Sequence, residues 1–140
     1  MNIERILAID YGHKRVGLAL SDPLKIFAYP FKTILNDDKF WDNLLKLISD
    51  ESVITIILGY PLKESGERST STILIENFKE ELEQKVKLPI ILRDERYTSD
   101  MARSLILESV PSKKKRRDKG LVDRNAASIL LQEYLDEIKK

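Results

Sequence analysis

Alternating hydrophobic and polar positions dominate the first quarter of the chain. They predict three strands, over residues 3–11, 16–21 and 26–34. Polar residues 12–14 provide a tight turn between the first two strands, which predicts a hairpin, and the third strand completes an antiparallel meander. Because both faces of the first strand are apolar, we expect it to lie centrally in a sheet that is covered on both sides.

The rest of the chain alternates between helical spacing and short apolar runs. Helices are predicted over 36–50 with a cap at Asn36 or Asp37, over 69–86, from Thr98 or Ser99 onward, and over 120–138. Continuous apolar runs at 53–58 and 89–92 are typical of buried parallel strands. This order predicts an α/β fold, in which parallel strands extend the meander into a mixed central sheet and helices flank it.

Length and composition favour one globular domain over residues 1–140. Hydrophobic residues make up 42% of the chain and charged residues 34%, which is too apolar for a disordered chain and too charged for a membrane protein. No window approaches the roughly 18 apolar residues of a membrane span, and the first residues do not resemble a signal peptide. We therefore expect a cytoplasmic location and no membrane partner.

Residue usage restricts the metal sites that the chain can build. It has no cysteine and one histidine, His13, which excludes thiolate and multi-histidine zinc sites as well as a cysteine nucleophile. Carboxylate oxygens remain as ligands, and they favour hard cations such as Mg²⁺ or Mn²⁺.

Three acidic residues stand where such a cation could bind. Asp10 and Glu95 each follow a predicted buried strand, and ligands in open α/β sheets gather outside the carboxyl ends of strands. Asp123 shares one face of the last predicted helix with apolar residues, so we expect it to face the sheet. Those residues are Ala126, Ala127, Leu130, Leu131, Tyr134 and Ile138.

Taken singly, each acid has a structural interpretation. Asp10 could initiate the hairpin turn, Glu95 could be a solvated acid ahead of a helix, and Asp123 could favour the helix dipole and pair with Arg124 or Lys119. Taken together, clustered carboxylates repel one another unless a cation neutralises them. Two cations about 4 Å apart can activate water and stabilise the leaving oxygen of a phosphodiester. We interpret the three acids as catalytic, metal-ligating residues.

A basic segment lies just before Asp123. The net charge is only +1, but a mobile loop predicted near 109–119 concentrates positive charge at Lys113, Lys114, Lys115, Arg116, Arg117 and Lys119. Such a loop would bind phosphates without reading sequence, although many charge runs are only solvated. Arg15 and Arg96 lie next to the acids and are further candidate nucleic-acid contacts, although surface ion pairs would look the same.

Several segments, in order along nearly the whole chain, resemble the YqgF family. Asp94-Glu95-Arg96 followed by Thr98 is the most specific of them, whereas an Asp-x-Gly turn alone is weak. The matching segments are Ala8-Ile9-Asp10-Tyr11-Gly12, Arg15-Val16-Gly17-Leu18-Ala19, Ser21-Asp22, Gly59-Tyr60-Pro61, Asp94-Glu95-Arg96-Tyr97-Thr98-Ser99 with Ala102, and Asp123-Arg124-Asn125-Ala126-Ala127.

The resemblance implies an RNase H-like fold, kinship with RuvC-type Holliday-junction resolvases, and a nuclease that matures the 5′ end of pre-16S ribosomal RNA in ribosome biogenesis. By position it implies Asp10, Glu95 and Asp123 as the acidic active-site residues. RuvC-type resolvases carry a second aspartate about one turn along the last helix, where this chain has Ala126. The number of metal ions therefore stays open.

Other functions also stay open. The chain could cleave branched DNA as a Holliday-junction resolvase, or it could be a non-catalytic nucleic-acid-binding factor in transcription. Actin-like sugar kinases also carry an Asp-x-Gly turn, but they need two lobes and this chain supplies one. Carboxylates and a basic loop serve RNA and DNA alike, and the chain could act as a monomer or, on a two-fold symmetric junction, as a homodimer.

Overall fold

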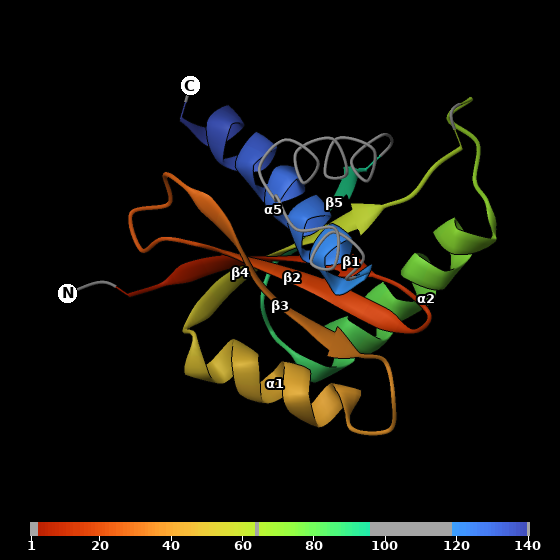
Figure 1. Ribbon diagram of the computed structural model, residues 1–140, viewed down its shortest axis with the longest axis horizontal. Helices are drawn as coiled ribbons and strands as arrows, with labels where there is room; N and C mark the ends of the chain where they lie inside the picture. The colour runs from red at the N-terminus through yellow and green to blue at the C-terminus, as the bar shows by residue number, and fades with distance from the viewer. Residues whose placement is uncertain (1–2, 64, 96–118, 140) are drawn as a thin grey trace.

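The computed structural model describes residues 3–63, 65–95 and 119–139 of the chain. Its elements in chain order are strands β1 (Arg5–Tyr11), β2 (Arg15–Ser21) and β3 (Ala28–Leu35), helix α1 (Phe40–Asp50), strand β4 (Val53–Tyr60), helix α2 (Thr70–Lys85), strand β5 (Ile90–Asp94) and helix α5 (Lys119–Ile138) (Figure 1).

The five strands form one mixed sheet in the order β3-β2-β1-β4-β5. The pairs β1·β2 and β2·β3 are antiparallel, whereas β4 joins β1 and β5 joins β4 in parallel. The predicted mixed sheet, a meander extended by parallel strands, is therefore confirmed. Because β1 is the middle strand, its backbone is paired on both sides and its side chains are covered by both layers of helices.

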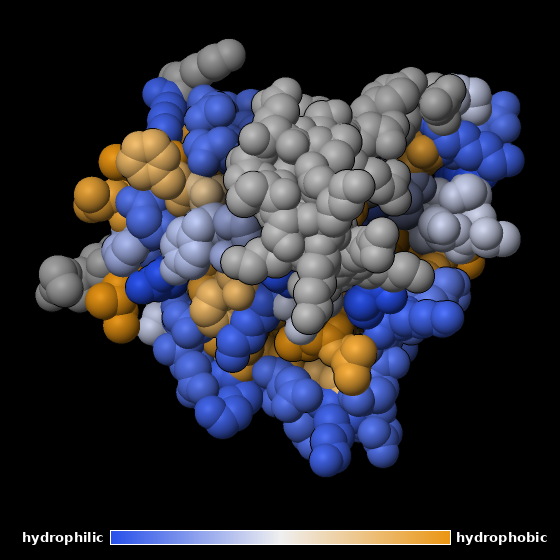
Figure 2. Space-filling model, viewed as in Figure 1, coloured by the Kyte–Doolittle hydropathy of each residue, from blue (hydrophilic) through white to orange (hydrophobic). Residues whose placement is uncertain are grey.

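Helices cover the two faces of the sheet with separate apolar cores. Helices α1 and α2 lie on one face, and α5 lies on the other (Figure 1). Alternation along β1 divides its side chains, so that Leu7 and Ile9 belong to the first core while Ile6 and Ala8 belong to the second. The surface over α1 is mostly hydrophilic (Figure 2), as expected of a helix that buries one stripe.

The helix ends differ from the predictions in two places. Helix α1 begins at Phe40 after a Lys39 cap that has no side-chain hydrogen bond, and Asp37 instead accepts a bond from the Lys39 N–H at 3.0 Å. The predicted cap at Asn36 or Asp37 is therefore wrong. In α5, Leu135 is buried and Ile138 is 49% exposed, so the apolar face predicted for this helix does not reach its last residue.

Helix α2 begins as its sequence indicates. Ser69 and Thr72 form a reciprocal capping box at its start, which satisfies two backbone N–H groups that have no partner within the helix. No helix in the described ranges is long and apolar enough to cross a membrane. The helix predicted near Thr98 or Ser99 and the loop predicted at 109–119, apart from Lys119, lie outside the described residues.

Candidate active site

Asp10 occupies the middle strand close to its carboxyl end. It is the sixth residue of β1, and alternation from Ile6 and Ala8 directs it to the face that α5 covers. Asp10 pairs with Gly17 on β2. On the other side Ile9 pairs with Leu58 of β4, so that Gly59 lies beside Asp10. The carboxyl group is thus flanked on both neighbouring strands by residues without side chains.

The two glycines admit the other two acids. A Cβ atom on Gly59 would lie 2.2 Å from Oε2 of Glu95, and one on Gly17 would lie 2.3 Å from the carbonyl carbon and oxygen of Asp123. A side chain at Gly17 would collide with the backbone of α5, and one at Gly59 would displace the end of the Glu95 side chain. The space beside Asp10 is therefore taken by the Glu95 side chain on one side and by the first turns of α5 on the other.

Glu95 is the first residue after β5, which is parallel to β4. Its backbone N–H donates to the Tyr60 carbonyl at 3.3 Å, which continues the register in which Tyr60 pairs with Asp94. The Glu95 side chain then lies across Gly59 and shares a hydrogen bond with the Asp10 carboxyl group. The carboxyl ends of β1 and β5 thus bring two acids into direct contact, although β4 separates these strands.

Both carboxyl groups have raised pKa values. Removal from water raises the pKa of Asp10 to about 6; the hydrogen bond from Glu95 opposes this rise, and repulsion by Asp123 adds to it. Removal from water also raises the pKa of Glu95 to about 9, together with the charge of Asp10 and the hydrogen bond to it. Glu95 therefore carries the shared proton near neutral pH, and Asp10 accepts it as a hydrogen bond.

Asp123 lies in the first turns of α5 and faces the sheet. Its Oδ2 accepts a hydrogen bond from Nε of Arg15 at 3.0 Å, and the two side chains are 23% and 32% exposed. The described partner of Asp123 is thus Arg15 on β2, which the sequence did not suggest, and the side chain of Lys119 lies outside what the structure describes. The charge of Asp123 still reaches Asp10 and raises its pKa.

The three acids differ in how fully they converge. Asp10 and Glu95 touch, whereas Asp123 is close to Asp10 but bound to Arg15. Within the described ranges, no three acidic or histidine side chains gather closely enough to form a metal-binding group. The donor set nevertheless suits a hard cation, because two half-buried carboxyl groups that share a proton supply oxygen ligands and gain from a positive charge.

The predicted nucleic-acid contacts are only partly described. Arg15 is paired with Asp123. Arg96 and the basic residues Lys113, Lys114, Lys115, Arg116 and Arg117 lie outside the described residues. Near the site, Nη1 of Arg124 donates to Oγ1 of Thr33 at 3.2 Å, and this hydroxyl group donates to the Gly120 carbonyl at 2.6 Å. These bonds fasten the start of α5 to β3.

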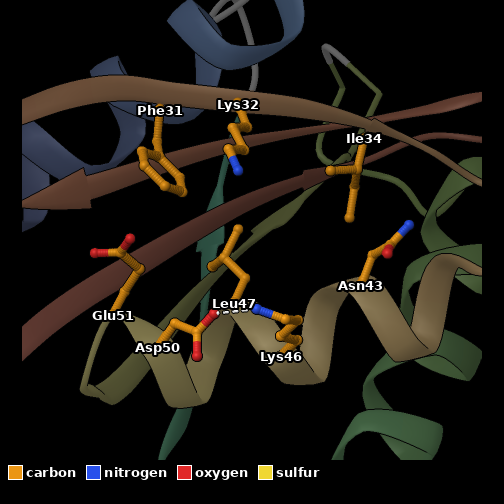
Figure 3. Close-up of a pocket in the computed structure, with 8 residues that line it drawn as sticks. All are labelled: Phe31, Lys32, Ile34, Asn43, Lys46, Leu47, Asp50 and Glu51. Atoms are coloured by element: carbon orange, nitrogen blue, oxygen red, sulfur yellow. Dashed lines mark hydrogen bonds and ion pairs between the residues drawn. The ribbon is translucent and has the colours of Figure 1, made fainter.

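A separate groove lies between β3 and α1. In Figure 3 the β3 side chains face the helix, and Lys46 pairs with Asp50 at 2.7 Å. The groove encloses about 200 Å³, less than the roughly 300 Å³ at which ligand pockets begin. Because several of its residues pack on the core beneath α1, it opens on the face opposite Asp10. Its lining residues are Phe31, Lys32, Ile34, Asn43, Lys46, Leu47, Asp50 and Glu51.

Sequence comparison identifies relatives along almost the whole chain. The family model described as "RuvX: Holliday junction resolvase" matches residues 4–137. A protein of Porphyromonas gingivalis named "Putative pre-16S rRNA nuclease" is 47% identical over 133 residues, which cover 94% of this chain and 96% of the relative. A relative of the same name in Dictyoglomus turgidum is 42% identical over 137 residues, with 96% and 95% covered.

Two solved structures have the same fold. The Thermus thermophilus RuvC complex with a Holliday junction substrate superimposes with a TM-score of 0.59 at 11% identity and covers 96% of each chain. The fowlpox virus resolvase bound to Holliday junction DNA gives a TM-score of 0.58 at 16% identity, with 97% of this chain and 99% of the other covered. The predicted RNase H-like α/β fold is thereby confirmed.

Proposed function

Since this chain belongs to the RuvX family and is, like its relatives, a nuclease that hydrolyses phosphodiester bonds, we propose that it is a metal-dependent endonuclease that processes the 5′ end of pre-16S ribosomal RNA. The observation that carries the proposal is the half-buried pair Asp10 and Glu95, two carboxyl groups that share one proton with Asp123 nearby.

The pair Asp10 and Glu95 suits catalysis better than structure. A half-buried carboxyl pair without a cation costs stability, since each group loses part of its hydration and repels the other. Folds retain such strain mainly at functional sites. Asp10 also lies on the middle strand, where an apolar residue would pack against the α5 core. A site in which a cation replaces the shared proton accounts both for the carboxyl pair and for an acid on the middle strand.

The residues that would hold Mg²⁺ or Mn²⁺ are Asp10 and Glu95, with Asp123 as a third ligand. When bound, such an ion stabilises negative charge on the phosphodiester and lowers the pKa of the attacking water. Asp10 sets the position of the site because β1 is paired on both sides. Glu95 closes one side of the site across Gly59, and α5 closes the other across Gly17.

Two observations bear on the substrate. The curated relatives carry the pre-16S rRNA name, which favours RNA. The family description and both resolvase structures favour branched DNA, so Holliday-junction cleavage is the second candidate. A linear RNA leader can be cut by a monomer, whereas a two-fold symmetric junction favours a homodimer. The proposal places the activity in one domain, residues 1–140, acting in the cytoplasm.

The substitution Asp10→Asn tests the proposal. We expect it to abolish cleavage of a pre-16S 5′ leader in Mg²⁺ or Mn²⁺, because it removes a ligand charge, while binding of the leader persists. Asp50→Asn serves as a matched control, since Asp50 is exposed and pairs with Lys46, and it should cleave like the wild type. Gel assays with the leader and with a four-way junction identify the substrate. Unchanged cleavage by Asp10→Asn would refute the carboxylate site.

A further inference from the structure

We propose that Arg15 is a positioning residue that turns the Asp123 carboxylate toward Asp10 and Glu95, and that it is not a contact to the nucleic-acid backbone. This inference rests on the proposed function, because it assigns a role within the same carboxylate site. Of the three candidate acids it concerns Asp123, the one that does not touch Asp10 in the fold.

The geometry comes from two positions on one strand. Arg15 and Gly17 are two residues apart on β2 and therefore point to the same face of the sheet, the face on which α5 lies. Gly17 admits the backbone of Asp123, since a Cβ there would lie 2.3 Å from its carbonyl atoms. Arg15 binds the side chain of the same residue at 3.0 Å. Together they determine both the place and the orientation of Asp123.

The form of the bond leaves Asp123 able to act as a ligand. Arg15 uses Nε and engages a single carboxylate oxygen, Oδ2. A carboxylate has two oxygens and about four acceptor positions, so Oδ1 stays available for a cation. Side chains that hydrogen-bond a metal ligand in this way fix its direction, and their loss typically costs 10- to 100-fold in metal affinity or activity.

Burial and charge favour this role over phosphate binding. The Arg15 side chain is only 32% exposed, and a guanidinium committed to a carboxylate loses much of its attraction for a phosphate. Asp123 is 23% exposed and close enough to raise the pKa of Asp10. Without Arg15, the Asp123 charge would be repelled by Asp10 and could turn away toward solvent. The ion pair therefore opposes the repulsion that would open the site.

Manganese binding without nucleic acid tests the inference. Calorimetry on the full chain at about pH 8 would compare the wild type with Arg15→Met and Arg15→Lys. We expect Arg15→Met to weaken Mn²⁺ affinity by about 10- to 100-fold, and Arg15→Lys to restore part of it because the ammonium keeps the charge and a donor. Binding of a pre-16S leader in EDTA should change less than twofold in either variant.

The chain offers a matched control in Arg93. This arginine also joins a strand to α5, through two bonds of 2.7 Å to Glu137. Arg93→Met removes a comparable link at the other end of the helix, so it should lower stability without changing Mn²⁺ affinity. If Arg93→Met weakened Mn²⁺ binding as much as Arg15→Met, the effect would reflect general docking of α5, and the positioning role would be refuted.

Two further outcomes are decisive. If Arg15→Met bound Mn²⁺ like the wild type but lost affinity for the leader in EDTA, Arg15 would be a phosphate contact and the inference would fail alone. Asp10→Asn tests the underlying site in the same titration. If Asp10→Asn kept the wild-type Mn²⁺ affinity, the carboxylate metal site itself would be wrong, and the inference would fall with it.

Discussion

The Asp10 side chain forms a hydrogen bond with Glu95, a residue that has the same charge when ionised. The contact does not bring two negative charges together, because Glu95 stays protonated and shares this proton with Asp10 in a hydrogen bond. The position of both acids was predictable from the strands that precede them. Their direct contact was not, because it depends on Gly59, which carries no side chain and gives no chemical signal in a single sequence.

The shared proton predicts how stability depends on pH. In the folded protein the pKa values of Asp10 and Glu95 are about 6 and about 9, above their ordinary values of 3.8 and 4.5. The folded state therefore binds more protons than the unfolded state between about pH 4 and pH 9. The stabilising effect of these protons is fully present below about pH 4 and is lost as pH rises through the folded pKa values.

We expect the metal-free protein to melt at a lower temperature near pH 8.5 than near pH 5.5. Over this interval Asp10 contributes about 1 kcal/mol, because its folded pKa of about 6 lies close to the lower pH, and the larger part of the change comes from Glu95. Scanning calorimetry in EDTA would measure it, and Mn²⁺ should raise the melting temperature mainly at the higher pH. Asp10→Asn should flatten the dependence. An equal slope in wild type and variant would contradict the shared proton.

Helix α5 completes the site at the scale of elements. Its apolar face was predictable from the spacing of Ala126, Ala127 and Leu130, and so was the inward direction of Asp123. The start of α1 was mispredicted because Asn36 and Asp37 are residue types that often cap helices. Whether one of them or Lys39 takes the cap position depends on the turn after β3. The sequence also could not reveal how closely α5 approaches β2, since Gly17 sets that distance.

We expect Gly17→Ala to displace the start of α5. The added methyl group would lie against backbone atoms of Asp123, which cannot move aside as a flexible side chain can. Overpacking of this kind typically costs about 1–3 kcal/mol, measurable by urea unfolding, and Mn²⁺ affinity should fall as well. Gly120→Ala is the control and should cost less, because the three atoms nearest its methyl group would belong to the Thr33 side chain, at 3.0–3.1 Å, and not to backbone. A neutral Gly17→Ala would show that α5 is not held this closely.

Charge at the scale of the whole molecule is nearly balanced. The chain has 24 basic and 23 acidic residues, so a uniform field cannot attract a polyanion. Attraction must come from local groups, and the densest run of positive charge is Lys113 to Arg117. The α/β class and the mixed sheet were accessible from the sequence because alternating and continuous apolar runs distinguish meander strands from buried parallel strands. That Asp10, Glu95 and Asp123 lie near one another became visible only in the folded structure.

We expect replacement of this basic run by glutamine to weaken binding of RNA and DNA alike. Five phosphate contacts contribute a slope of about −3.5 to −4.5 in a plot of log K against log salt, and the slope should become less negative by up to that amount. Fluorescence anisotropy across a salt series would measure it. Lys46→Gln is the control, because Lys46 pairs with Asp50 on the opposite layer. An unchanged slope would assign phosphate binding to other residues.

The order of the elements along the chain also orders events in time. The strand with Asp10 is synthesised first, whereas the helix with Asp123 follows all five strands. The ion pair between Arg15 and Asp123 spans 108 residues, and contacts so distant in sequence form late in folding. Until α5 docks, this helix does not cover Ile6, Ala8, Ala19 and Ile57, and Asp123 is not yet near Asp10. Under the proposed function, a half-made or partly folded chain would lack the Asp123 ligand, and hydrolysis would begin only once α5 has docked on the sheet.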